Sequence, residues 1–393
     1  MVAATPYNVP RDPLMGGNHL TAVRWVLAGL VALGHAFLLT EAWEPVRIHQ
    51  WTGGYMAVNG FFVLSGMLIA KSLDLGGSLR RYAAARALRI YPALIVVMLS
   101  FPLFFAPFFG EPGGWSALTS SESWAYVARV LLMGSPENAP GGIFTGSLEE
   151  DFNGPLWTIR YEVAAYVLAA LGFAVGVLKR PLPTLFAYLV VQTVYLVLPL
   201  MWDPSTVSPS ILPLLRLSSA FLLGMCLWQF PEARRPHWVL VLGVIVAFAL
   251  WGAGPLGEWL ATLAVTGLML RIGLSDTLHA RVQTLPDYSY GIYIWHYPAM
   301  QMVLSVQPDI DPAGLALLST PLFIILAAAS WHAVEKPVLR LKPRGAGRVN
   351  RIDGESARLE TLPQPSIAPT LIEGDDPPTP PQGDDHVRYP KRR

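Results

Sequence analysis

The stretch HLTAVRWVLAGLVALGHAFLL, residues 19–39, decides the fold class. A helix needs roughly 20 mostly apolar residues to cross a bilayer, and this stretch has that character. Runs of the same kind recur along the chain, approximately at 20–40, 53–71, 91–110, 155–178, 182–201, 211–230, 237–254, 257–274, 287–307 and 313–335. We therefore predict an all-α fold, a polytopic transmembrane helical bundle of about ten spans.

The composition of the chain is that of a membrane protein. Of its 393 residues, 53% are hydrophobic and 14% are charged, whereas a soluble domain carries about 25% charged residues. The net charge of +1 gives no general attraction to nucleic acid. The single cysteine, Cys226, excludes an internal disulfide and a cysteine-based metal site, and we expect no metal. The N-terminus lacks the charged n-region and short apolar h-region of a cleaved signal peptide, so the first run should remain as a helix.

Basic residues gather on alternate connections between the apolar runs. These residues are Lys71, Arg80, Arg81, Arg86, Arg89, Lys179, Arg180, Arg234, Arg235, Arg271 and Arg281, with Lys336, Arg340, Lys342 and Arg344 after the last run. The positive-inside rule makes this side cytoplasmic, so both termini are predicted to be cytoplasmic. The connection 111–154 then lies on the opposite side, where we expect a short helix near 121–134.

Three segments follow from this pattern. Residues 1–19 form a cytoplasmic N-terminal segment, and residues 20–342 form the membrane domain. Residues 343–393 are rich in Pro, Gly, Asp, Glu and Arg. Such a composition cannot bury enough apolar surface to fold, so it predicts a disordered cytoplasmic tail.

Ionisable side chains within the apolar runs are expensive to bury and point to function. Arg24 and His35 are eleven residues apart in the first run. At about 100° per residue, eleven residues make about three full turns of a helix, so the two side chains lie on the same face. Glu162, in the fourth run, has nearly the predicted depth of His35, so a carboxylate that orients a histidine base can form there. A packed histidine and an ion pair of Glu162 with Arg160 or Arg216 are the alternatives.

Two further sets of residues have competing interpretations. His296, in the ninth run, is the rival candidate for a general base, against the interpretation of a packed histidine. Arg86 and Arg89 lie three residues apart on one helix face, with Arg81 one to two turns earlier. Neighbouring guanidinium groups bind phosphate through paired hydrogen bonds. Binding of anionic lipid headgroups is the alternative for these arginines.

Six motifs, in this order, resemble those of the acyltransferase 3 family of integral-membrane acyltransferases. They are Arg24-x10-His35, FFVLSG (61–66), RALRIYP (86–92), PLWTIRYE (155–162), YSYGIYIWHYP (288–298) and VEKP (334–337). The resemblance covers about residues 20–340. It departs from the family at Asn59, where an acidic residue is common.

The resemblance implies an O-acyltransferase that moves an acyl group, commonly acetyl, from acyl-CoA to a hydroxyl of a carbohydrate, a lipid-linked glycan or a secondary metabolite. It identifies His35 as the essential histidine, and we assign Glu162 as its catalytic partner. The residues expected to bind acyl-CoA are Arg24, Arg81, Arg86 and Arg89. The oxyanion donor stays open among Ser65, Asn59, Tyr161 and a backbone amide near Gly66.

The resemblance also implies the partners and the location. Acyl-CoA is a co-substrate, no cofactor is bound, membrane lipid surrounds the bundle, and no nucleic acid is expected. The predicted location is the cell membrane, specifically a bacterial inner membrane. A proton-coupled membrane transporter would use the same buried His, Arg and Glu groups and is the alternative function. The chain has no internal repeat of the kind that many transporters show.

Overall fold

The computed structural model describes residue 14 and residues 19–76, 78–111, 114–145, 147–202, 208–275 and 285–341. This part of the chain is almost entirely helical and belongs to one compact unit that ends at Pro343. Two short antiparallel strands, β1 (Arg47–Ile48) and β2 (Trp51–Thr52), close the connection after the first helix. Most of the predicted N-terminal segment and the whole predicted tail, 343–393, lie outside the described residues.

The predicted runs coincide with helices. These are α1 (Leu20–Leu38), α2 (Gly53–Gly76), α3 (Leu79–Ser100), α6 (Trp157–Ala174), α7 (Pro181–Met201), α8 (Ile211–Gln229), α9 (Trp238–Trp251), α10 (Pro255–Gly273), α11 (Ser289–Val306) and α12 (Pro312–Ser330). A π-helical turn, Phe101–Phe105, joins α3 to α4 (Ala106–Phe109), and another, Trp331–Glu335, joins α12 to α13 (Lys336–Leu339). The all-α, polytopic bundle is confirmed.

Not every predicted run gives a helix that is both long and apolar enough to span a membrane. Within the described ranges, eight helical segments are long and apolar enough to cross a membrane. Helix α9 has only 14 residues, and α11 is the aromatic helix that contains His296. Most side chains of α11 are buried against neighbouring helices, so its polar and aromatic residues contact protein.

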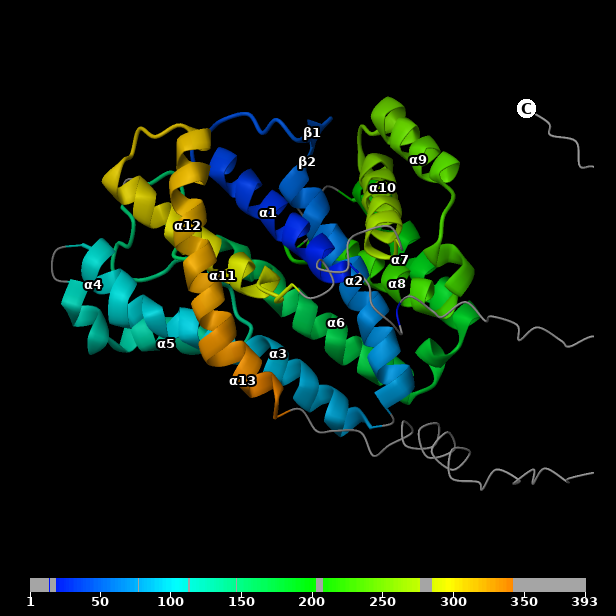
Figure 1. Cartoon of the computed structure of the whole chain (residues 1–393), viewed down its shortest axis with the longest axis horizontal. Helices are drawn as coiled ribbons and strands as arrows, with labels where there is room; N and C mark the ends of the chain where they lie inside the picture. The colour runs from blue at the N-terminus through cyan, green and yellow to red at the C-terminus, as the bar shows by residue number, and fades with distance from the viewer. Residues whose placement is uncertain are drawn as a thin grey trace, which may run out of the picture. The chain divides into compact units, whose positions relative to one another are not determined.

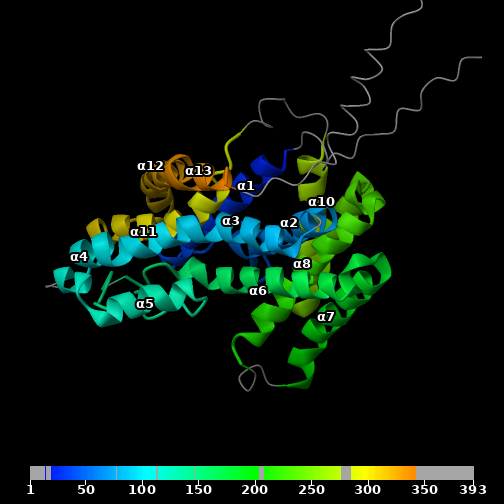
Figure 2. The same cartoon turned by 90° about the horizontal axis from the view of Figure 1, so that it is seen from below.

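The connection 111–154 contains the expected short helix, α5 (Ser121–Leu131). Its N-terminus is fixed by Ser120, whose side-chain oxygen accepts a hydrogen bond from the amide of Ser123. Glu122 in the first turn and Arg129 in the last turn suit the helix dipole. In Figure 2, α5 and α4 lie beside each other at one end of the bundle.

The closest helix crossing brings α2 against α8. A Cβ atom on Gly66 would lie 1.9 Å from the carbonyl oxygen of Phe221, and one on Gly224 would lie 2.0 Å from that of Val63. Both distances are far inside van der Waals contact, so the crossing requires glycine on both helices. Small residues that allow such an approach are typical of helix packing in membranes.

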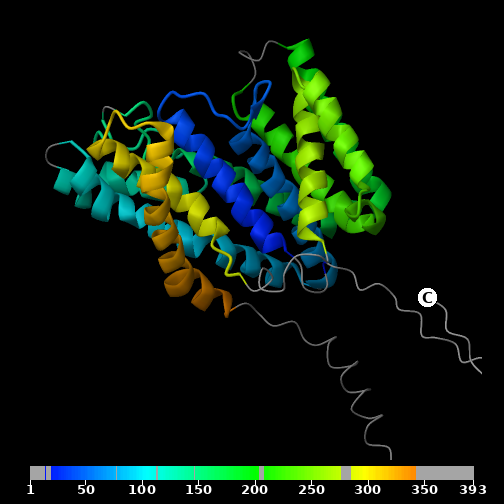
Figure 3. The same cartoon turned by 45° about the horizontal axis from the view of Figure 1, so that its top comes forward.

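The other helices are arranged around α1 and α2. Figure 1 shows α1 between α2 and α11, and α12 packs on the other side of α11. Helices α9 and α10, yellow-green in Figure 3, pack as a pair, and α10 contacts α2. We call the end with Lys71 and Arg80 to Arg89 the basic end, and the end with the connections 41–52 and 111–154 the opposite end.

Candidate active site

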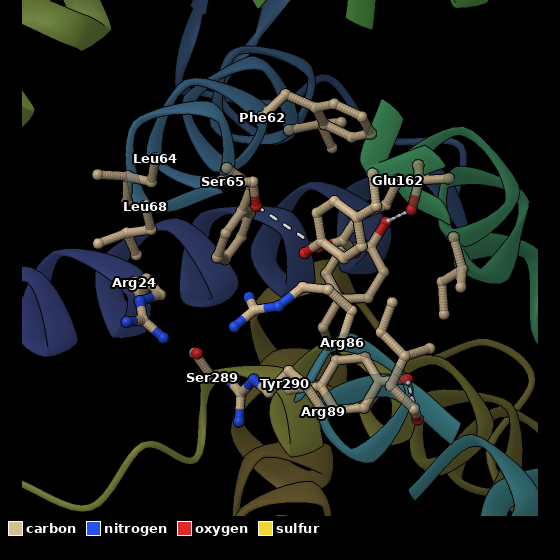
Figure 4. Close-up of a pocket in the computed structure, with 17 residues that line it drawn as sticks. Arg24, Phe62, Leu64, Ser65, Leu68, Arg86, Arg89, Glu162, Ser289 and Tyr290 are labelled. Atoms are coloured by element: carbon tan, nitrogen blue, oxygen red, sulfur yellow. Dashed lines mark hydrogen bonds between the residues drawn. The ribbon is translucent and has the colours of Figure 1, made fainter. Parts of the chain in front are cut away.

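An inner cavity of about 130 Å³ lies toward the basic end. Arg24 of α1 and Arg86 and Arg89 of α3 line it, together with apolar side chains of α2. Figure 4 shows the three guanidinium groups gathered on one side of this cavity, with Ser65 and Glu162 on the other. The structure thus places these three arginines at one cavity, and their predicted role in binding acyl-CoA stays a prediction. Arg81, which was grouped with them, does not line the cavity.

Two of the three arginines share one carboxylate. Arg24 forms an ion pair with Asp287, and Arg89 Nη2 lies 2.9 Å from Oδ2 of the same side chain. Arg89 Nη1 also lies 3.4 Å from Oε2 of Glu335. Burial alone would raise the pKa of Asp287, but Arg89 and Arg24 outweigh it and lower that pKa to about 2. Asp287 therefore stays ionised and links α1, α3 and the start of α11.

Arg86 differs from its two neighbours. None of the ion pairs among the described residues includes it, and its Nε is buried without a hydrogen-bond partner. Its guanidinium carbon lies 5.8 Å from the ring centre of Tyr166. Arg86 therefore has unused hydrogen-bond donors at the cavity, which suits the binding of an anion.

Glu162 lies at the inner cavity and not beside His35. Its Oε1 accepts a hydrogen bond from the hydroxyl of Tyr166, and Ser65 Oγ lies 3.4 Å away. The predicted pairing of His35 with Glu162 is therefore wrong. The alternative ion pairs of Glu162 with Arg160 or Arg216 are absent from the described part of the chain as well.

An outer cavity of about 290 Å³ lies toward the opposite end and contains His35 in its lining. Tyr55 at the start of α2, Trp157 at the start of α6 and Arg216 near the start of α8 also line it. Two residues, Val58 and Tyr293, line both cavities. The arginine site and the histidine site are thus neighbouring chambers separated at these two side chains.

The two candidate bases, His35 and His296, are in contact. His35 Nδ1 lies 2.8 Å from the carbonyl oxygen of Val31, and His296 Nδ1 lies 3.0 Å from that of Ile292. Because a carbonyl only accepts, each Nδ1 carries the hydrogen of the neutral ring. His296 Nε2, 3.2 Å from His35 Nδ1, is then an acceptor. His35 Nε2 keeps a free lone pair, which is the form a general base requires.

The candidate oxyanion donors lie in different places. Ser65 lines the inner cavity. Asn59 is fully buried and donates to Glu258 Oε1 at 2.6 Å and to Thr262 Oγ1 at 2.8 Å. Gly66 packs against α8 as described above. Asn59 is neutral at a position where an acidic residue is common in the family. A carboxylate is nevertheless present there, because Glu258 of α10 accepts a hydrogen bond from Asn59.

The sequence reasoning missed Asp287 and the contact between His35 and His296. Asp287 is the first residue of the ninth apolar run, two residues before α11 begins, so its position suggested a polar helix end and not a buried ion-pair partner. Its place directly before the YSYGIYIWHYP motif was the available signal.

Comparisons with known proteins agree with this architecture. Residues 18–332 match the family described as an acyltransferase domain. The chain is 29% identical over 339 residues to an O-acetyl transferase of Shigella phage Sf6, covering 82% of this chain and 96% of the relative. It is 24% identical over 380 residues to nodulation protein 10 of Rhizobium leguminosarum bv. viciae, covering 83% and 94%. No solved structure matches the chain.

Proposed function

Because the chain belongs to the acyltransferase domain family, and is thus a multi-pass membrane O-acyltransferase, we propose that its donor is acyl-CoA and its general base is His35. The acyl group is commonly acetyl, and the acceptor is a hydroxyl of a carbohydrate, a lipid-linked glycan or a secondary metabolite. The relatives come from a bacterium and a phage of bacteria. This origin supports a bacterial inner membrane as the location.

One observation carries the proposal: the arginine cavity and the histidine cavity meet at Val58 and Tyr293. Acyl-CoA has an anionic nucleotide end and a slender, largely uncharged arm that ends in the thioester. The inner cavity offers cations on one side and apolar walls from α2, which match these two parts. The thioester would then reach the partition, with the acceptor hydroxyl on the other side.

The arginines have unequal tasks in this arrangement. Arg86 has no carboxylate partner in the described part of the chain, so it can bind a donor phosphate without breaking an existing ion pair. Arg89 and Arg24 are already held by Asp287. They supply positive charge to the cavity and keep their positions through the ion pairs with Asp287. A phosphate bound nearby would interact with these two arginines in addition to Asp287.

The chemistry requires one substitution and two proton transfers, from the acceptor hydroxyl to His35 and from His35 to the leaving thiolate. His35 Nε2 removes the proton of the acceptor hydroxyl as its oxygen attacks the thioester carbon. The new C–O bond forms, the C–S bond breaks, and the CoA thiolate leaves and takes up a proton. The carbonyl of Val31 holds His35 Nδ1–H, and it favours the imidazolium that forms during the step.

The test uses purified protein in nanodiscs with acetyl-CoA, and follows the release of free CoA thiol with and without acceptor. His35→Ala should lower the rate by about 10²- to 10⁴-fold, as expected for a positioned base, while acetyl-CoA binding persists. His332→Ala is the matched control, because His332 hydrogen-bonds Tyr288 at the basic end. Equal CoA release by the wild type and His35→Ala would contradict the proposal. Acetyl-CoA that is neither bound nor consumed would favour the transporter.

A further inference from the structure

The outer cavity contains a buried cation that the proposed reaction does not use. Arg216 of α8 is 7% exposed and lines this cavity with His35. Its guanidinium carbon lies 3.7 Å from the ring centre of Tyr55 and 5.9 Å from that of Trp157. The guanidinium therefore makes a close cation–π contact with Tyr55 and a longer one with Trp157, which favours a fixed position for the group.

Arg216 has no ion pair within the described ranges of the chain, and its Nε is buried without a hydrogen-bond partner. It interacts electrostatically with Glu258, but beyond ion-pair distance. Asn59 Nδ2 donates to that carboxylate, at 2.6 Å from Glu258 Oε1, and also lies 2.8 Å from Thr262 Oγ1. A buried charge without a close partner is costly, and in a membrane helix it marks a substrate path.

The other charged groups of the outer cavity are already engaged. Glu44 Oε1 accepts hydrogen bonds from the amides of Gly53 at 2.7 Å and Gly54 at 3.3 Å, at the start of α2. Arg47 donates through Nε to the carbonyl of His49, and its guanidinium covers the ring of Trp43 at 4.2 Å. Arg216 differs from Arg47 because it is buried, so its free donors lie in the cavity and not in solvent.

We propose that the outer cavity binds an acceptor that carries an anion, a carboxylate or a phosphate, which pairs with Arg216 and so presents a neighbouring hydroxyl to His35. The inference rests on the proposed function, because it names the class of acceptor for the same site. Tyr55 and Trp157 line the same cavity and add apolar wall next to Arg216, as is usual where a few polar groups orient a ligand. A neutral acceptor would leave the guanidinium buried and unpaired.

The experiment compares matched acceptors in nanodiscs with acetyl-CoA as donor. Octyl glucoside is the neutral acceptor, octyl glucuronide carries a carboxylate, and octyl glucoside 6-phosphate carries a phosphate. The wild type should prefer one of the anionic acceptors in kcat/KM by about 10- to 100-fold, the range of a charge-assisted hydrogen bond. Which anion is preferred separates a uronic-type acceptor from a phosphorylated one.

Variants of Arg216 test whether this residue causes the preference for anionic acceptors. Arg216→Gln should bring the ratio of anionic to neutral acceptor close to one, and Arg216→Lys should keep part of it because a point charge cannot replace the fork. Arg160→Gln is the control, since Arg160 donates to Tyr161 and does not line the outer cavity. It should leave the ratio unchanged.

Dissociation constants of the same three compounds, measured without donor, keep the test decisive even if none is acylated. A wild type that binds or uses neutral and anionic acceptors equally overturns the inference. So does Arg216→Gln with an unaltered ratio. Both results are distinct from a failure of the proposed function, in which acetyl-CoA itself is not bound or cleaved.

Discussion

Replacement of His296 tests the geometry assigned to the base. In His296→Ala, the anchor between His35 Nδ1 and the carbonyl of Val31, 2.8 Å long, remains. The change removes only the 3.2 Å contact from His35 Nδ1 to His296 Nε2. The tautomer of His35 should therefore persist, and its Nε2 should stay available as the base.

The expected loss follows from that single contact. A neutral hydrogen bond contributes about 0.5–1.5 kcal/mol net. If the whole amount is lost from the positioning of the base, kcat falls by about 2- to 13-fold. This is far less than the loss of about 10²-fold or more expected for His35→Ala. His296→Gln should recover part of the rate, because its amide oxygen can accept from His35 Nδ1.

The assay is the release of CoA thiol at saturating acetyl-CoA, with the melting temperature of each variant measured in the same nanodiscs. The melting temperature matters because His296 is fully buried, and its truncation leaves a cavity. If folded His296→Ala is as inactive as His35→Ala, the minor role given to His296 is wrong. If His35→Ala stays active while His296→Ala does not, the roles given to the two histidines are reversed.

Further predictions concern the donor site, the helix crossing, the ionic network and the topology. Arg86→Ala should weaken acetyl-CoA binding by about 10- to 100-fold with little change in melting temperature, whereas Arg81→Ala should leave binding unchanged; titration with acetyl-CoA measures both. Gly66→Val should prevent folding or strongly lower the melting temperature of the protein, since any Cβ at this position meets the α8 backbone. A stable, active variant would contradict the close approach of α2 to α8. Asp287→Asn should be less stable than the wild type near pH 7 by about 2 kcal/mol, and this difference should shrink as pH falls below about 4 toward 2. The reason is that the folded pKa of Asp287 is depressed, so its contribution is lost on protonation; a gap that does not depend on pH would refute it. In a Cys226→Ala background, a cysteine at residue 140 should react with an impermeant thiol reagent in intact cells, and one in the C-terminal tail should not.

The helices were predictable because apolar runs of spanning length have few other uses. The protein environment of α11 was harder to predict. Its length matched a span, but only the tertiary structure shows that its aromatic and polar residues contact α1 and α12. The same limit applies to α9, whose 14 helical residues are shorter than the run that predicted it.

The sequence pointed to residues that line the two cavities, but it did not give the contacts between their side chains. Helix rise gave His35 and Glu162 nearly the same depth, but depth does not fix direction around the helix axis. Helix α1 packs against α2 and α11, whereas α6 packs against α2 and α8. His35 therefore meets His296, and Glu162 turns to Ser65 and Tyr166. Neighbour relations between helices are set by packing, for which a single sequence gives little signal.

The partition between the two cavities has a consequence for the electrical insulation of the membrane. Val58 and Tyr293 line both chambers, so they form the partition between them. In the proposed reaction a thioester would reach this point, while a path open to protons and other ions would dissipate the membrane potential. Tyr293 is held by the hydroxyl of Thr158 at 2.7 Å and the carbonyl of Pro155 at 3.1 Å. These bonds keep the ring in place, so under the proposed mechanism the partition where acyl transfer occurs is also the barrier to ion flow.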